Sequence, residues 1–241
     1  MANAPGWQAG LDRLPKLASV FELDPRKTAL VVIDMQYLDA HPDYGLGPYL
    51  RRNYPESFSY YFGRVASTVL PNHLKLLEFF RKNGLRVIYL AAGPLLADRS
   101  DLTPSRKVRE SGKVGGRPSY LSSVGSFEHQ VLPEIAPQQG ELVLDKNSSS
   151  PFSSTAIDQL LRNMGIEYLV VTGVLTFACV LLTAADAADR GYRCVVVEDA
   201  VAGLDQAHHE ATLRVFAAIY GRVETTEAVC AEMQRQLAVV R

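Results

Sequence analysis

The sequence is poor in cysteine and has no long hydrophobic run. Three cysteines among 241 residues are an odd number and too few for a disulfide-stapled domain, so we expect a reducing, cytoplasmic location. No apolar run approaches the ~20 residues that cross a bilayer, and the N-terminus lacks a signal-peptide pattern, so we expect no membrane association. Neither charge sign is in excess: 25 basic and 26 acidic residues give a net charge of −1, which predicts no nucleic-acid partner.

Short apolar segments rich in valine and isoleucine alternate with segments of helical periodicity. Nearly continuous apolar runs are typical of strands buried on both faces. They occur at residues 29–33, 87–91, 142–144, 168–171 and 194–197. Helical patterns occur at residues 65–82, 153–163, 177–190, 206–220 and 227–239. This alternation predicts an α/β fold with helices on both faces of a mostly parallel sheet, and a site beyond the carboxyl ends of the strands.

Two further segments stand outside this pattern. Residues 1–25 are proline-bearing and show little periodicity, which predicts an N-terminal arm that lies over a domain or a neighbouring subunit. Residues 26–241 are predicted to form a single domain. Within it, residues 93–130 are long, irregular and rich in glycine and proline, which predicts a lid or insert beside the site.

Three predicted strands are each followed by a reactive side chain. Asp34 follows the first strand, Lys146 the third and Cys179 the fourth. Taken singly, each has an ordinary structural interpretation, as a loop cap, a solvated strand end and a small core residue. Because the ends of parallel strands meet at one edge of the sheet, we expect the three side chains to lie together.

The three residues form a chemically complete set for acyl transfer. Thr176 is a candidate N-cap, which would make Cys179 the third residue of a helix and expose its thiol to the positive end of the helix dipole. Such a position, with Lys146 nearby, is expected to lower the thiol pKa. Asp34 then serves as the base, and main-chain N–H groups of the turn as oxyanion donors. The remaining cysteines, Cys194 and Cys230, are interpreted as structural.

The segments TALVVIDMQ and GVLTFACV, together with Lys146 and the Ser and Phe residues after it, resemble the isochorismatase-like cysteine hydrolase family. The resemblance implies a three-layer α/β/α sandwich with a six-stranded, mostly parallel sheet, residues 223–225 forming the sixth strand. It implies a catalytic triad of Asp34, Lys146 and Cys179. It also implies a cis peptide between Val174 and Leu175, with the Leu175 and Cys179 N–H groups as the oxyanion hole, and assembly into a tetramer or dimer.

The substrate is less sharply indicated. Nicotinamidases of this family hold a metal with histidines after the second strand, where this chain reads AAGPLLADRS, so we expect neither a metal nor another cofactor. The segment SDLTPSRKVRESGK is similar to the corresponding segment of biuret-, ureide- and N-carbamoyl-cleaving members. The residues expected to contact substrate are Gln36, Tyr37, Tyr44, Arg106, Arg109 and Phe152. The two arginines are expected to bind a carboxylate or carbonyl group of the substrate.

We therefore predict a cysteine-dependent amidohydrolase that cleaves a C–N bond of a small amide, ureide or N-carbamoyl compound through a thioester. Two alternatives stay open from the sequence. One is Asp-dependent hydrolysis of a vinyl ether, as in isochorismatase itself, which need not use a cysteine. The other is a non-catalytic binding protein that has kept the scaffold.

Overall fold

Six strands form one parallel sheet at the centre of the molecule. The computed structural model describes residues 6–11, 15, 17–18, 20–110 and 122–239. The strands are β1 Thr28–Ile33, β2 Arg86–Ala92, β3 Leu142–Lys146, β4 Tyr168–Val174, β5 Arg193–Ala202 and β6 Arg222–Glu224. They lie in the order β3-β2-β1-β4-β5-β6, and every pairing in the sheet is parallel. The α/β fold with a six-stranded parallel sheet is thus confirmed.

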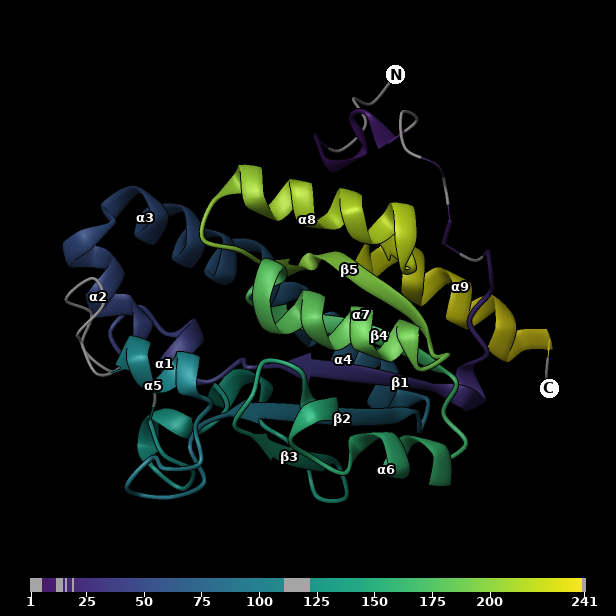
Figure 1. The fold of residues 1–241 in the computed structure, drawn as a ribbon. Helices are drawn as coiled ribbons and strands as arrows, with labels where there is room; N and C mark the ends of the chain where they lie inside the picture. The colour runs from purple at the N-terminus through teal and green to yellow at the C-terminus, as the bar shows by residue number, and fades with distance from the viewer. Residues whose placement is uncertain (1–5, 12–14, 16, 19, 111–121, 240–241) are drawn as a thin grey trace.

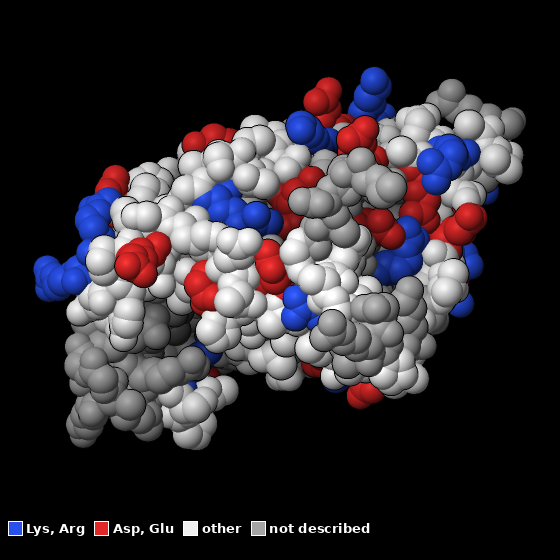
Figure 2. Space-filling view, turned by 90° about the horizontal axis from the view of Figure 1, so that it is seen from above, with Lys and Arg blue, Asp and Glu red and all other residues white. Residues whose placement is uncertain are grey.

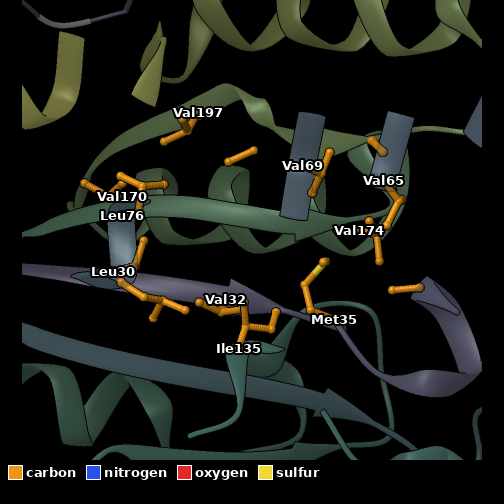
Figure 3. Close-up of a cluster of buried hydrophobic side chains, with 14 of the residues drawn as sticks. Leu30, Val32, Met35, Val65, Val69, Leu76, Ile135, Val170, Val174 and Val197 are labelled. Atoms are coloured by element: carbon orange, nitrogen blue, oxygen red, sulfur yellow. The ribbon is translucent and has the colours of Figure 1, made fainter. Parts of the chain in front are cut away.

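Helices cover both faces of the sheet (Figure 1). One face packs on α4 Leu70–Lys82 and α9 Thr226–Val239, and the other on α6 Ile157–Asn163, α7 Leu181–Asp189 and α8 Gln206–Ile219. All six residues of β1 are buried because their side chains enter two cores in alternation. Leu30 and Val32 pack with Val65, Val69 and Leu76 on one side (Figure 3), and Ala29, Val31 and Ile33 pack on the other. This two-sided burial explains the continuous apolar runs of the sequence.

The remaining helices lie at the carboxyl ends of the strands, at the left of Figure 1. They are α1 Tyr37–Ala40, α2 Leu46–Asn53, α3 Pro55–Arg64 and α5 Pro104–Glu110. Short helical turns are η1 Gly6–Gln8, η3 Pro25–Lys27, η4 Val65–Val69, η5 Phe127–His129, η6 Pro133–Ile135, η7 Pro151–Ser153 and η8 Thr176–Val180. The helix predicted at residues 65–82 is therefore the end of a longer helical stretch that starts at Pro55 and passes through the π-turn η4.

The described part of the N-terminal arm lies on its own chain. Trp7 is buried against α8, its indole N–H donates to the Glu198 carboxylate, and Arg214 of α8 donates to the Trp7 carbonyl. Farther along, the amide of Leu23 donates to Glu232 of α9 at 2.7 Å. The arm therefore bridges α8, β5 and α9.

The surface carries mixed charge. Acidic and basic side chains are interspersed over the face seen in Figure 2, in keeping with the net charge of −1. Among the helices that the structure describes, none combines the length and apolar character needed to cross a bilayer.

Candidate active site

Asp34, Lys146 and Cys179 meet at the carboxyl ends of β1, β3 and β4. The Lys146 ammonium lies between the other two side chains: Nζ is 2.9 Å from Asp34 Oδ2 and 3.4 Å from Cys179 Sγ. A third donation, at 3.2 Å, goes to the Ser148 carbonyl. Asp34 lies 112 residues before Lys146, and Cys179 lies 33 residues after it. The parallel pairing of their strands therefore brings the three residues together.

The backbone at Asp34 aims its carboxylate into this site. Asp34 has a φ of +53°, in the left-handed region that few residues other than Gly, Asn and Asp adopt. Its amide still donates to the Leu90 carbonyl of β2, so the turn begins immediately after a paired residue. Gly173 of β4 lies alongside: a Cβ there would come within 2.0 Å of the Ile33 carbonyl oxygen, so this approach of the two strands requires glycine.

Lys146 is a buried cation. Its side chain is fully buried and is paired with a carboxylate that is also almost fully buried. Burial disfavours the ammonium, but its interactions with the Asp34 carboxylate and the Cys179 sulfur together outweigh burial and raise the Lys146 pKa above its usual value. Lys146 therefore stays protonated at neutral pH and serves as a fixed positive charge between base and thiol.

The turn that carries Cys179 differs from the sequence prediction. The helical segment begins at Thr176, with Leu175 in the capping position, and opens as a π-turn, so Cys179 is its fourth residue. Thr176 does not cap the helix, because its hydroxyl is buried and shares a 2.9 Å hydrogen bond with Nδ1 of His209 on α8. The Leu175 carbonyl accepts from the amides of Ala178 and Val180.

The expected lowering of the Cys179 pKa is also wrong. The thiol is buried, and burial together with the adjacent Asp34 carboxylate raises its pKa, which the Lys146 charge opposes without reversing. The resting nucleophile is thus a neutral thiol next to a carboxylate that can take its proton. The peptide bond between Val174 and Leu175, directly before this turn, is cis.

Two of the residues expected to contact substrate have structural partners instead. Gln36 is fully buried; its amide nitrogen donates to the carbonyls of Ala92 and His129, and its oxygen accepts from the Ala92 amide at 2.7 Å. Because its polar atoms are engaged, it joins β2 to the insert rather than facing a ligand. Phe152 lies against Tyr192 and Arg190. Arg190 follows the last turn of α7, so the Phe152 ring packs on side chains at the carboxyl end of that helix.

Tyr37 and Tyr44 belong to an aromatic cluster at the sheet's carboxyl edge. Their ring centroids are 5.5 Å apart, and Phe127 of η5 packs against both, at 4.5 Å and 5.3 Å. Phe127 remains half exposed. The cluster forms an apolar wall between α1 and η5, and the two tyrosines stay predicted substrate contacts.

Arg106 of α5 reaches the site from the insert. It is 9% exposed, and its Nη2 lies 3.4 Å from the Ser149 hydroxyl, next to the serine whose carbonyl binds Lys146. The side chain of Arg109, the other arginine expected here, lies outside the described residues.

His129 and Asp145 are neighbours of the site that sequence reasoning missed. His129 Nε2 lies 3.3 Å from Asp145 Oδ1, and the nearby Asp34 carboxylate also acts on the imidazole. Burial outweighs both carboxylates and lowers the pKa of His129. Asp145 directly precedes Lys146, so its place in the sequence could have indicated that it lies near the site. His129 lies in an irregular segment, and no sequence pattern marks it as a neighbour of the site.

The described residues contain no group of three or more His, Cys, Asp or Glu side chains placed to hold a metal ion. The chemistry available at the site is that of a thiol, a carboxylate and two cations. A metal-free reaction remains a prediction.

Comparison with known proteins places this site in context. A sequence model of the isochorismatase domain matches residues 28–228. A cysteine hydrolase from Pseudomonas syringae pv. phaseolicola 1448A shares the fold, with a TM-score of 0.76, 24% identity and coverage of 92% of this chain and 99% of its own. An isochorismatase family protein from Desulfovibrio vulgaris has a TM-score of 0.70 and 26% identity, covering 90% and 100%. N-carbamoylsarcosine amidase from Thermoplasma acidophilum is 32% identical, with a TM-score of 0.59 and coverage of 83% and 97%.

Proposed function

Since this chain belongs to the isochorismatase family of hydrolases, we propose that it uses Cys179 to hydrolyse a C–N bond of a small amide, ureide or N-carbamoyl compound. One observation carries the proposal: the buried Lys146 ammonium touches both the Asp34 carboxylate and the Cys179 sulfur. A thiol, a base and a fixed cation within hydrogen-bonding reach of one another are what covalent acyl transfer requires.

The first half of the reaction forms a thioester. Asp34 takes the proton of the Cys179 thiol as the sulfur attacks the substrate carbonyl carbon, and Lys146 stabilises the developing thiolate. The negative charge on the carbonyl oxygen is held by the backbone N–H groups of Leu175 and Cys179. Asp34 then gives its proton to the leaving nitrogen, the C–N bond breaks, and ammonia or an amine departs.

The second half releases the acid. Asp34, again a carboxylate, removes a proton from a water molecule that attacks the thioester carbonyl. The C–S bond breaks, Asp34 gives its proton to the sulfur, and the resting thiol is restored. Throughout, the raised pKa of Cys179 keeps the thiol protonated until a substrate carbonyl is in place, which limits side reactions of the thiolate.

The similarity to N-carbamoylsarcosine amidase supports the choice of C–N bond. That protein's name describes cleavage of an N-carbamoyl compound, and its identity to this chain is 32%. We further propose that the chain works in the cytoplasm and that it assembles into a dimer or tetramer. Light scattering of the purified protein would test the assembly state.

The proposal is tested by ammonia release from a panel of primary amides, ureides and N-carbamoyl compounds. Wild-type protein is expected to release ammonia, whereas Cys179→Ala and Asp34→Asn each lose at least about 1,000-fold in kcat, because the three groups act as one unit. Circular dichroism of both variants checks that the fold is intact. Near-normal turnover by Cys179→Ala would refute covalent catalysis, and hydrolysis of a vinyl ether by that variant would indicate the Asp-dependent alternative.

A further inference from the structure

Arg106 is a buried cation with no counter-ion in the part of the chain that the structure describes. Its side chain is 9% exposed, Nη2 has a long 3.4 Å contact with the neutral Ser149 hydroxyl, and Nη1 is buried without a hydrogen-bond partner. Among the residues that the structure describes, no carboxylate pairs with this guanidinium. Burying an ionised group costs several kcal/mol unless it is paired, so a buried arginine of this kind is normally matched by an anion.

The guanidinium belongs to the active site. The chain from residue 146 to 149 links the two cations: Lys146 donates to the Ser148 carbonyl, and Arg106 contacts the next residue, Ser149. Burial is the largest influence on both pKa values: it lowers that of Lys146 and raises that of Cys179. The Arg106 charge lowers the pKa of both groups. Its field therefore reaches the nucleophile and the central lysine.

The charges of the site do not balance. Asp34 and Lys146 cancel, Cys179 is a neutral thiol, and Arg106 leaves the buried site with one excess positive charge. The acids nearby are only partly buried and lie against other groups. Asp145 lies against the His129 imidazole, and Asp101 accepts from the backbone amides of Leu95 and Leu96 and from the Asn147 side chain. The unpartnered Nη1 and the excess positive charge of the buried side chains favour a ligand that carries a negative charge.

We infer that Arg106 binds a carboxylate on the substrate, so that the enzyme takes amides or N-carbamoyl compounds that also carry a carboxylate, in preference to neutral ureides. The inference rests on the proposed function and names its substrate class. Guanidinium groups suit this task because their planar donors match a carboxylate in paired hydrogen bonds. Ureido acids and monoamides of dicarboxylic acids are the two simplest chemical classes that meet the requirement.

Matched substrate pairs provide the first test. N-carbamoyl-β-alanine is compared with its carboxamide, and succinamic acid with succinamide, since each pair differs only in the anionic group. Wild type should prefer the acid of each pair. Arg106→Gln should lower kcat/KM for the acid about 10- to 100-fold, mainly through a higher KM, and should change kcat/KM for the amide by less than about threefold. Arg106→Lys should restore part of the loss. Lys107→Gln is the control, because Lys107 is an exposed neighbour on the same helix.

Binding to Cys179→Ala provides the second test, because it needs no turnover. Calorimetry should detect the acids with Cys179→Ala but not with the double variant that adds Arg106→Gln. Arg106→Gln alone should unfold at an equal or higher temperature than wild type without ligand, since it removes an unpaired buried charge. Equal binding of acid and amide, binding that is insensitive to Arg106→Gln, or no binding of any acid overturns the inference. Arginine-dependent binding of acids without turnover by wild type would leave it standing and refute the proposed function.

Discussion

At the residue scale, two opposite charges act on the Cys179 sulfur. Lys146 Nζ lies 3.4 Å away and favours the thiolate, while the Asp34 carboxylate favours the thiol. Burial decides the balance, because a thiolate loses more hydration than a thiol does. The helix dipole and the nearby lysine by themselves predict a lowered thiol pKa. Burial and the Asp34 carboxylate outweigh them, and both depend on residues distant in the chain.

This balance predicts the pH dependence of Cys179 alkylation. Because the thiol pKa is raised, the rate of reaction with iodoacetamide should climb about tenfold per pH unit from neutral to alkaline pH without a plateau near neutrality. Asp34→Asn removes a group that raises the pKa, so it should speed alkylation at pH 7.5 while abolishing turnover. Intact-protein mass spectrometry gives the rates, and Cys179→Ser identifies the modified site. A plateau below about pH 8, or slower alkylation of Asp34→Asn, would contradict this account.

At the element scale, the nucleophile turn is held from outside its own helix. Thr176 starts η8, and its hydroxyl is tied to His209 on α8. Burial lowers the pKa of His209 to about 3, so the imidazole is neutral at working pH and the bond joins two neutral groups. Downstream, Thr183 of α7 donates to the Cys179 carbonyl at 2.6 Å. The position of the cysteine thus depends on two threonines that flank it.

Thr176→Val tests whether the bond to α8 positions the nucleophile. The substitution keeps the shape of the side chain but leaves the buried His209 Nδ1 without its partner, which should cost about 1–3 kcal/mol of unfolding free energy. Turnover should fall through kcat more than through KM, and Thr176→Ser should recover both properties. Urea unfolding and steady-state kinetics measure the two effects. Thr212→Val is the matched control, because the Thr212 hydroxyl bonds only within α8 near the surface; an equal effect there would remove the special role of Thr176.

At the scale of the whole molecule, two buried histidines tie stability to pH. His73 of α4 is fully buried with Nε2 unpartnered, and burial lowers its pKa to about 4, as it lowers that of His209 to about 3. Above the unfolded-state pKa of about 6.5 both imidazoles are neutral in both states. As pH falls below that value the unfolded chain takes up protons that the folded chain does not, so the stability they contribute is lost toward pH 4 and below.

The free energy of unfolding is therefore expected to fall by about 6 kcal/mol between pH 7 and pH 4 from these two groups. His73→Leu should flatten this profile, since it removes one of the two groups. Urea unfolding of wild type and variant at a series of pH values measures the two profiles. A profile of His73→Leu that matches wild type would show that His73 titrates normally in the folded protein.

Most of the fold could be predicted from the sequence. The strands beginning at Thr28, Arg86 and Tyr168 were predicted to within a few residues, because strands buried on both faces are apolar throughout. The family resemblance and the six-stranded sheet are confirmed. Helices α1 to α3 were missed, because each is short and the segment from residue 37 to 64 is rich in aromatic and polar residues.

The sequence by itself determined that Asp34, Lys146 and Cys179 lie together, because parallel pairing of their strands brings all three to one edge of the sheet. Tertiary packing decided how those residues behave. It engaged Gln36 in backbone hydrogen bonds, set Phe152 at the carboxyl end of α7, and buried Arg106 with its Nη1 unpartnered. The physical reason is that solvation and charge pairing depend on neighbours brought from distant parts of the chain. A local pattern of residues therefore does not predict the solvation or charge pairing of a side chain.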